Sequence, residues 1–389
     1  MKKAIFILLL VFTAAVSAAQ VQVGAELTDM YLPRLEGKRV ALLSNHTGVI
    51  PEGEHTLDLL LRNGVDVKVI FSPEHGFRGT ADAGAHVNSS VDEKTGIPIA
   101  SLYSGKKGDA VKQVIDSVDV IICDLQDVGV RYYTYYITML RLMNAAAGAG
   151  KEFMVFDRPN PIGMMVDGPV LDMNLKSGVG ALPIPVAHGM TLGEMARMIV
   201  GEKWLDGGRD LQLTVIPCRG YTHATRYTLP VNPSPNLKSM KAIYLYPSTC
   251  YFEGTPVSLG RGTDEPFEIY GHPAMQKGDF YFTPRSMAGA KNPPQLGKRC
   301  RGRDLRALSD DEIIAGGVDF SYIIDAYRNT RLPAKTPFFT KFFNLLTGDS
   351  RVATMIKEGK SADEIRASWA DDVSRFRKLR AKYLLYPEK

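Results

Sequence analysis

The stretch VDVIICDL (residues 118–125) decides the fold class of this chain, because it is apolar at almost every position. Near-continuous apolar runs of this length are typical of strands in a parallel sheet that helices cover on both faces. Its last polar residue, Asp124, opens a loop rich in acids and aromatic side chains. We therefore expect VDVIICDL to be a buried strand of an open α/β sheet, with chemistry at its carboxyl end.

Strand-like and helix-like segments alternate on both sides of this stretch, from Arg39 to Cys218. The other expected strands are RVALLSN (39–45), VDVKVIF (65–71), IPIASLY (97–103), EFMVFD (152–157) and LQLTVIP (211–217). The expected helices are HTLDLLLRNG (55–64), DAVKQVIDS (109–117), TYYITMLRLMNAAAGAG (134–150) and one that begins at Thr191, where Thr191 and Glu194 form a capping box. This alternation predicts a Rossmann-like, doubly wound parallel sheet.

The chain has 389 residues, which is too long for one hydrophobic core, so we expect two domains. Residues 1–19 read as a cleaved signal peptide, because two lysines precede a short apolar run that ends in small residues. That run is too short for a comfortable membrane span, so we expect a periplasmic or secreted protein without a membrane anchor. A Rossmann-like α/β catalytic domain is expected over residues 20–235. The proline- and glycine-rich remainder, residues 236–389, is expected to form a smaller α+β domain.

Composition and missing motifs exclude several classes of protein. The net charge of +5 is mild and no dense Lys/Arg stripe occurs, which argues against a nucleic-acid partner. The sequence has no GxGxxG after its first strand and no GxxxxGK[ST], so a dinucleotide or a nucleoside triphosphate is not indicated. It also lacks G-x-S-x-G and HExxH. Its four cysteines are too sparse for a disulfide scaffold, and Cys123 is expected to be a buried free thiol.

Polar signatures follow four of the expected strands, where ligands bind in open α/β sheets. They are SNHTG (44–48), SPEHGFRG (72–79), DLQDVGVRYYTY (124–135) and DRPNP (157–161). Glu74 stands out because Pro73 and Gly76 can hold it rigidly and partly desolvated on a strand-to-loop bend. Burial raises the pKa of a carboxyl group, as a general acid requires near neutral pH. The structural alternative is that Glu74 caps the next backbone turn.

Two further chemistries remain open at these loops. A guanidinium matches a carboxylate, so the arginines at 78, 131, 158 and 261 are candidates for an anionic substrate group. The alternative is an ion pair with a neighbouring acid, namely Asp157 for Arg158 and Glu253 for Arg261. A metal site would combine His46, His75 and His86 with Asp82, Asp124 or Asp127. The scattered histidines lack a characteristic ligand spacing, which disfavours that site.

Seven motifs in order resemble the bacterial exo-β-N-acetylmuramidase family. They are SNHTG, SPEHGFRG, DLQDVGVRYYTY, DRPNPIGM (157–164), PVAHGMTLGE (185–194), NPSPNL (232–237) and FEGTPVSLGRGTDEPFE (252–268). The resemblance implies an exported glycoside hydrolase that releases N-acetylmuramic acid from the non-reducing end of peptidoglycan fragments. It also implies a cleft between the two domains, no cofactor, and a catalytic glutamate at Glu74. Leu259, in PVSLG, departs from a position that is often polar or acidic in the family, which bears on a loop contact.

Glycoside hydrolysis commonly uses two carboxylates, and Glu74 is expected to protonate the leaving oxygen. Asp124, Asp127 and Glu253 are candidates for the second carboxylate; alternatively, the substrate's own 2-acetamido group is the nucleophile. Arg78 or Arg131 is expected to bind the lactyl carboxylate of N-acetylmuramic acid. The expected substrate-binding residues are Asn45, His46, His75, Arg78, Gln126, Arg131, Tyr132, Asp157, Arg158, Asn160, Asn232, Ser234, Asn236 and Arg261.

The expected partners are peptidoglycan-derived muropeptides or fragments that end in N-acetylmuramic acid linked to N-acetylglucosamine. Two other classes of function stay open. One is a metal-dependent hydrolase of another cell-wall bond, such as an amidase or an esterase. The other is a non-catalytic periplasmic muropeptide-binding protein.

Overall fold

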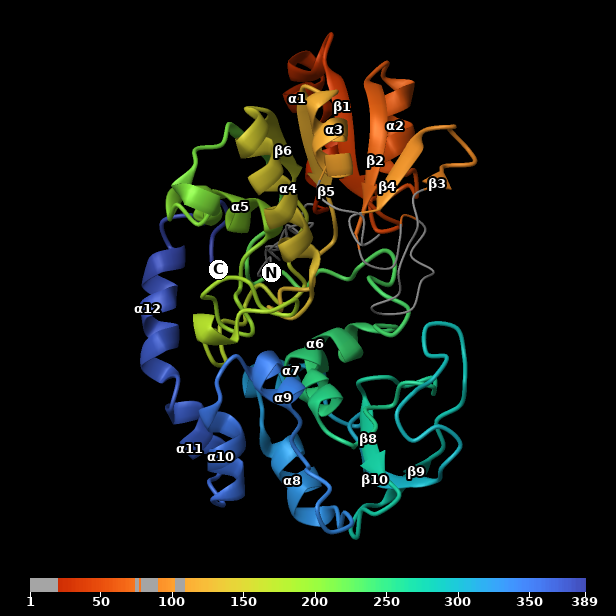
Figure 1. Ribbon diagram of the computed structural model, residues 1–389, viewed down its shortest axis with the longest axis vertical. Coiled ribbons are helices and arrows are strands. Elements are labelled where there is room, and N and C mark those ends of the chain that lie inside the picture. Colours follow the sequence, from red (N-terminus) through yellow and green to blue (C-terminus); the bar gives the residue numbers. More distant parts are fainter. Residues whose placement is uncertain (1–19, 74–76, 78–89, 102–108) are drawn as a thin grey trace, which may run out of the picture.

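The computed structural model describes residues 20–73, 77, 90–101 and 109–389 (Figure 1). Its centre is a seven-stranded sheet with the order β3-β4-β2-β1-β5-β6-β7. The strands are β1 (Arg39–Ser44), β2 (Asp66–Ser72), β3 (Ser90–Val91), β4 (Pro98–Ser101), β5 (Val120–Asp124), β6 (Glu152–Phe156) and β7 (Leu213–Ile216). Neighbouring strands are parallel, apart from the antiparallel edge pair of β3 and β4. All six predicted strands are therefore confirmed.

The alternate residues of β5 supply two separate cores. Ile121 and Cys123 belong to the cluster that includes the helices α3, α4 and α5, whereas Val120 and Ile122 belong to the cluster that includes α1 and α2. The helices of this part are α1 (Thr28–Leu35), α2 (Thr56–Arg62), α3 (Asp109–Asp116), α4 (Tyr135–Ala149) and α5 (Leu192–Gly201). Because both faces of the strand are covered, its sequence has no polar alternation, and the doubly wound fold is confirmed.

The order of the strands reverses direction at β1, which fixes where a ligand can bind. The chain passes from β1 to β2 on one side and later returns to β5 on the other side, with Leu43 in register with both Phe71 and Cys123. Open α/β sheets bind ligands at such a switch point, beyond the carboxyl ends of the strands. The loops after β1 and β5 lie at this edge.

The second part of the chain packs on the same edge of the molecule (Figure 1). It contains the antiparallel sheet β8-β10-β9 and a group of short helices. The strands are β8 (Ile269–His272), β9 (Phe280–Phe282) and β10 (Cys300–Asp304). The helices are α6 (Met240–Thr249), α7 (Asp310–Gly316), α8 (Ser321–Asn329), α9 (Lys341–Thr347), α10 (Arg351–Lys357), α11 (Ala362–Ala367) and α12 (Ala370–Arg380). A smaller α+β part is thus confirmed, while its boundary at residue 236 stays a prediction.

The last residues of the chain return to the first part, a feature that the sequence did not suggest. Figure 1 shows α12 running back toward α5. The Arg380 guanidinium donates to the carbonyl of Gly189 at 2.9 Å, and the Tyr386 hydroxyl donates to Oδ2 of Asp157 at 2.6 Å. The two parts also share one continuous hydrophobic cluster. The hydrogen bonds at the carboxyl end therefore join parts that already pack against each other.

Three smaller expectations concern caps, thiols and membrane spans. The capping box at the start of α5 is confirmed, with Glu194 N donating to Thr191 Oγ1 and Thr191 N to Glu194 Oε2. The cysteines are buried and free, as predicted for Cys123. Over the residues that the structure describes, no helix is both long and apolar enough to span a bilayer. The predicted signal peptide, residues 1–19, lies outside the described residues and stays a prediction.

Candidate active site

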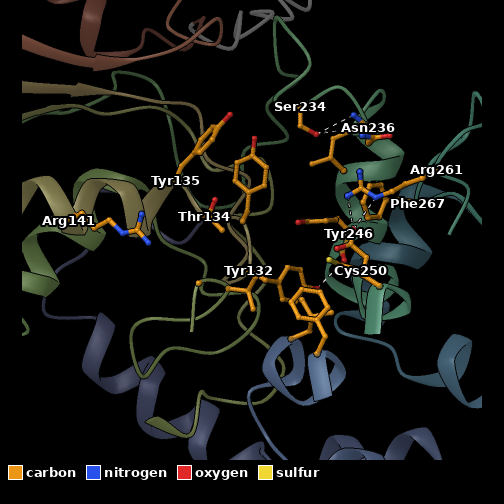
Figure 2. Close-up of a pocket in the computed structure, with 17 residues that line it drawn as sticks. Tyr132, Thr134, Tyr135, Arg141, Ser234, Asn236, Tyr246, Cys250, Arg261 and Phe267 are labelled. Atoms are coloured by element: carbon orange, nitrogen blue, oxygen red, sulfur yellow. Dashed lines mark hydrogen bonds and ion pairs between the residues drawn. The ribbon is translucent and has the colours of Figure 1, made fainter. Parts of the chain in front are cut away.

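A cavity of about 400 Å³ lies between the sheet part and the second part of the chain (Figure 2). The loop from β5 to α4 contributes Tyr132 and Thr134 on one side. On the other side, Figure 2 shows Ser234, Asn236 and Arg261 pointing toward the same space. Other lining residues are Tyr133, Tyr135, Arg141, Gly178, Val179, Leu237, Tyr246, Cys250, Glu253, Phe267, Phe342 and Leu346. The volume falls within the range of small-ligand sites, about 300–1,000 Å³.

Hydrogen bonds join three of the sequence motifs at the rim of this cavity. The hydroxyl of Tyr133 donates to the Pro233 carbonyl at 2.7 Å, and the Asn45 amide donates to the Tyr135 hydroxyl at 2.7 Å. His46 Nε2 lies 2.9 Å from the carbonyl of Asn232. The SNHTG, RYYTY and NPSPN segments are therefore brought together as predicted, although Asn45 itself is fully buried and serves to position the tyrosine.

An ion pair between Glu253 and Arg261 forms part of the cavity wall. Nη2 and Nε of Arg261 donate to the same oxygen, Oε1 of Glu253, at 2.6 and 3.1 Å. Among the described residues, Oε2 of Glu253 and Nη1 of Arg261 have no hydrogen-bond partner. The Glu253 side chain is 26% exposed and the Arg261 side chain 19%, so neither is sealed off in the interior. The ion pair anticipated from the sequence is present, and it leaves one oxygen of Glu253 and one nitrogen of Arg261 for a ligand.

Close packing around this pair fixes the positions of its two side chains. Glu253 lies on the short 3-10 helix Cys250–Gly254, where a Cβ on Gly254 would come within 2.4 Å of the Phe343 Cα. The guanidinium of Arg261 lies 5.2 Å from the centre of the Phe267 ring, which holds it over an aromatic face. Leu259, which the sequence resemblance singled out, is fully buried in the core beside them.

Asp124 and Arg158 form a buried ion pair beneath the site, not at its surface. Nε and Nη2 of Arg158 donate to the two carboxylate oxygens of Asp124 at 2.6 and 2.9 Å, and both side chains are almost completely buried. Nη1 of Arg158 donates to the Val49 carbonyl at 2.8 Å. The expected partner, Asp157, is not the one used. This bidentate geometry assigns Asp124 and Arg158 a structural role and corrects the expectation of direct substrate contact.

Asp157 is the centre of a buried hydrogen-bond network. Its carboxylate accepts from the Gly193 N–H, the Thr191 hydroxyl and the Tyr386 hydroxyl, which links β6, α5 and the carboxyl end of the chain. Burial raises the pKa of Asp157 to about 6, although these hydrogen bonds oppose that rise. Because the side chain is fully buried and does not line the cavity, we assign it to holding the architecture together.

The raised pKa makes stability depend on pH in a defined window. An unfolded Asp titrates near pH 3.8, so between about pH 4 and pH 6 the folded chain binds the additional proton. The free energy of unfolding should therefore fall as the pH rises through this window, by up to about 3 kcal/mol from Asp157 alone. Urea unfolding of wild type and Asp157→Asn at pH 4, 5, 6 and 7 measures this contribution as the change in the difference between them. A difference that stays constant over this range would contradict it.

Arg131 is also part of the interior. It is fully buried, and its terminal nitrogens donate to four carbonyls, those of Pro169, Ile184, Leu346 and Thr347. The last two belong to α9, so the side chain joins the two parts of the chain. Both terminal nitrogens are used, which corrects the expectation that Arg131 binds the lactyl carboxylate. Gly348 is required beside it, because a Cβ there would lie 2.5 Å from Nη2.

The remaining predicted polar residues at the ends of β5 and β6 are buried as well. Gln126 donates to the carbonyls of Asp127 and Pro159, and Asn160 donates to Met190 O. Oδ2 of Asp127 accepts from Gly129 N at 2.8 Å and lies 3.7 Å from Nε2 of His188. Oδ1 of Asp127 and Oε1 of Gln126 are buried and have no partner among the described residues. His188 was missed in the sequence, where a lone histidine in a loop carries no spacing signal.

Glu74, His75 and Arg78 lie outside the described residues, as do Asp82 and His86 of the metal alternative. The last described residues before Glu74, Ser72 and Pro73, are buried at the carboxyl end of β2, beside the end of β1. In the described part of the chain, no three His, Cys, Asp or Glu side chains gather as a metal site would require. Of the predicted binding residues, Tyr132, Ser234, Asn236 and Arg261 line the cavity, together with the candidate carboxylate Glu253.

Comparison with known proteins identifies relatives along almost the entire chain. A family model described as exo-beta-N-acetylmuramidase NamZ, N-terminal, matches residues 40–241, and its C-terminal counterpart matches residues 244–386. A peptidoglycan beta-N-acetylmuramidase NamZ of Bacillus subtilis (strain 168) is 36% identical over 94% of this chain and 92% of its own length.

Two crystal structures of DUF1343 family proteins from Bacteroides fragilis NCTC 9343 have the same fold. One is 54% identical, with a TM-score of 0.88 over 95% of this chain and 100% of its own. The other is 27% identical, with a TM-score of 0.74 over 94% of this chain and 99% of its own.

Proposed function

The chain belongs to the exo-beta-N-acetylmuramidase NamZ family, and from this membership we infer that its cavity receives the non-reducing end of a peptidoglycan fragment. It is an exo-acting glycoside hydrolase that releases N-acetylmuramic acid from that end. The observation that supports the assignment of the site is the Glu253–Arg261 pair, which lines the cavity and has one atom on each partner without a bond among the described residues.

Glu253 is the partner carboxylate in this proposal. Arg261 bonds only its Oε1, so Oε2 is left for the role of nucleophile, base or oxocarbenium stabiliser. Asp124 cannot serve in this way because Arg158 occupies both of its oxygens. Asp127 retains one free oxygen, yet its side chain is almost completely buried, so it ranks below Glu253.

Glu74 is the proton donor in this proposal, by the match of its PEHG motif to the family. The bond between the anomeric carbon and the leaving oxygen breaks, and that oxygen takes the proton of Glu74. Water then supplies the hydroxyl group to the anomeric carbon and a proton that restores Glu74. This hydrolysis uses no cofactor.

The cavity wall offers suitable contacts for the sugar. Nη1 of Arg261 is the free donor that we assign to the lactyl carboxylate, since a guanidinium and a carboxylate match in geometry. The rings of Tyr133, Tyr246 and Phe267 supply apolar faces for the pyranose ring. Ser234 and Asn236 bring polar atoms to the same wall, although each already makes a bond within its own turn or to Gly289.

The substrate would be a peptidoglycan fragment outside the cytoplasm. Residues 1–19 would direct export, and the fragments would end in N-acetylmuramic acid linked to N-acetylglucosamine. An amino terminus near Ala19 or Gln20 in protein recovered outside the cytoplasm tests the export assignment. Recovery of the protein only inside the cytoplasm, with Met1 retained, would contradict it.

The direct test of function is to incubate the protein with the disaccharide of N-acetylmuramic acid and N-acetylglucosamine. We expect free N-acetylmuramic acid as the product, identified by mass spectrometry. Loss of activity on treatment with a chelator would favour a metal-dependent hydrolase instead. Tight binding of the disaccharide without turnover would favour a muropeptide-binding protein.

A further inference from the structure

A second cavity of about 370 Å³ shares the Glu253–Arg261 pair with the first. Its other walls come from the segment between Gly289 and Pro294, which connects β9 to β10. The ion pair is therefore a partition that both cavities touch. Nothing in the sequence motifs pointed to this segment, because it has neither periodicity nor a cluster of acids.

The first cavity is the more enclosed of the two. Tyr132, Tyr133 and Tyr135 form a buried side of it, although Arg141 and Gly178 at its margin are exposed. The second cavity opens to solvent at Lys291, Asn292 and Pro294. A site that removes one terminal sugar needs a closed end for that sugar and an open side for the rest of the chain. The first cavity fits the closed end, and the second cavity fits the continuation.

The segment is held firmly against the motifs of the first cavity. The amide of Asn236 donates to the Gly289 carbonyl at 2.8 Å, and Arg285 N donates to Gly262 O at 2.8 Å. Gly289 has a φ of +78°, and a Cβ there would lie 2.5 Å from the Cβ of Pro235. Gln295 Nε2 adds a bond of 2.9 Å to the Pro256 carbonyl. The second cavity is thus a built feature whose wall is fixed by the same residues that shape the first.

Charge is concentrated in this region. Between residues 276 and 306 there are eight Lys or Arg residues and two Asp residues, a net charge of +6, whereas the entire chain carries +5. Arg261 and Lys291 are the cations that line the second cavity; Arg261 is paired with Glu253, whereas Lys291 has no ion-pair partner among the described residues. An exposed, unpaired ammonium group on a cavity wall attracts an anionic group of a ligand.

We propose that the second cavity binds the sugars on the leaving-group side of a glycan longer than a disaccharide, and that Lys291 pairs with the lactyl carboxylate of its next N-acetylmuramic acid. This inference rests on the proposed function. In an alternating glycan the terminal residue occupies the first cavity, N-acetylglucosamine passes the Glu253–Arg261 partition, and the following sugar carries the carboxylate. The ligand class is therefore an anionic, peptide-free peptidoglycan oligosaccharide.

The test compares a disaccharide with a peptide-free tetrasaccharide, both with N-acetylmuramic acid at the non-reducing end. The wild type should have a higher kcat/KM on the tetrasaccharide, and Lys291→Gln should lower that value about fivefold through KM, with the disaccharide rate unchanged. Lys291→Arg should retain the preference. Lys277→Gln removes the same charge from the same region at a residue that does not line the cavity, and it should have no effect.

The outcomes separate this inference from the function on which it rests. If the wild type releases N-acetylmuramic acid from the disaccharide but Lys291→Gln keeps the full tetrasaccharide preference, the inference is wrong and the function stands. Equal kcat/KM values for the two substrates in the wild type would also overturn it. If neither substrate is cleaved, the proposed function itself is wrong, and the inference that rests on it is wrong with it. A tetrasaccharide preference that weakens as salt is added, in the wild type but not in Lys291→Gln, would support the role of Lys291.

Discussion

A Glu74→Gln variant should release N-acetylmuramic acid from the disaccharide about 10³-fold more slowly than the wild type. Positioned general acids contribute about 10²- to 10⁴-fold, and glutamine cannot donate the proton that the leaving oxygen needs. The loss should appear in kcat, because the proton moves in the transition state and not on binding. Initial rates of sugar release, with the unfolding midpoint checked for each protein, measure the effect.

The choice of leaving group distinguishes a proton donor from a residue that only shapes the site. In an aryl N-acetylmuraminide the leaving group is a stable phenolate, which needs little protonation. Glu74→Gln should therefore retain much more activity on this substrate than on the disaccharide. Glu253→Gln is the matched control, because it removes the charge of the partner carboxylate and should slow both substrates alike. If Glu74→Gln slows both substrates equally while Glu253→Gln spares the aryl glycoside, the two roles must be exchanged.

The fold could be predicted because its signal is local. VDVIICDL, RVALLSN and EFMVFD are apolar on both faces, and that pattern arises from a sheet with two cores, whichever residues fill them. The capping box at Thr191 is equally local, since Glu194 is three residues away. The return of the carboxyl end could not be predicted, because the bond from Tyr386 to Asp157 joins residues 229 positions apart.

The candidate site was only partly predictable, because sequence shows charge but not burial. Arg131, Arg158 and Arg261 look alike as arginines in polar loops, yet only Arg261 lines the cavity. What separates them is which carbonyls and carboxylates the fold places around each guanidinium, and those partners are distant in the sequence. The wall at Gly289–Pro294 was missed for the same reason, since its role depends on the contact with Asn236.

Replacing Arg158 with methionine should lower the free energy of unfolding by about 3–5 kcal/mol, the range expected when one partner of a buried ion pair is removed. The cost arises because the Asp124 carboxylate would stay buried with no opposite charge, and the Val49 carbonyl would lose its donor.

The exposed pair of Arg39 and Asp119 is a matched control for this change, since it is also bidentate, at 2.7 and 3.0 Å, but lies in solvent. Arg39→Met should therefore cost far less than Arg158→Met. Adding Asp124→Leu to Arg158→Met should recover part of the loss, because it removes the stranded charge. Urea unfolding of the wild type, the two single variants and the double variant gives these values. Equal costs for Arg158→Met and Arg39→Met would show that burial does not set the strength of the Asp124 pair.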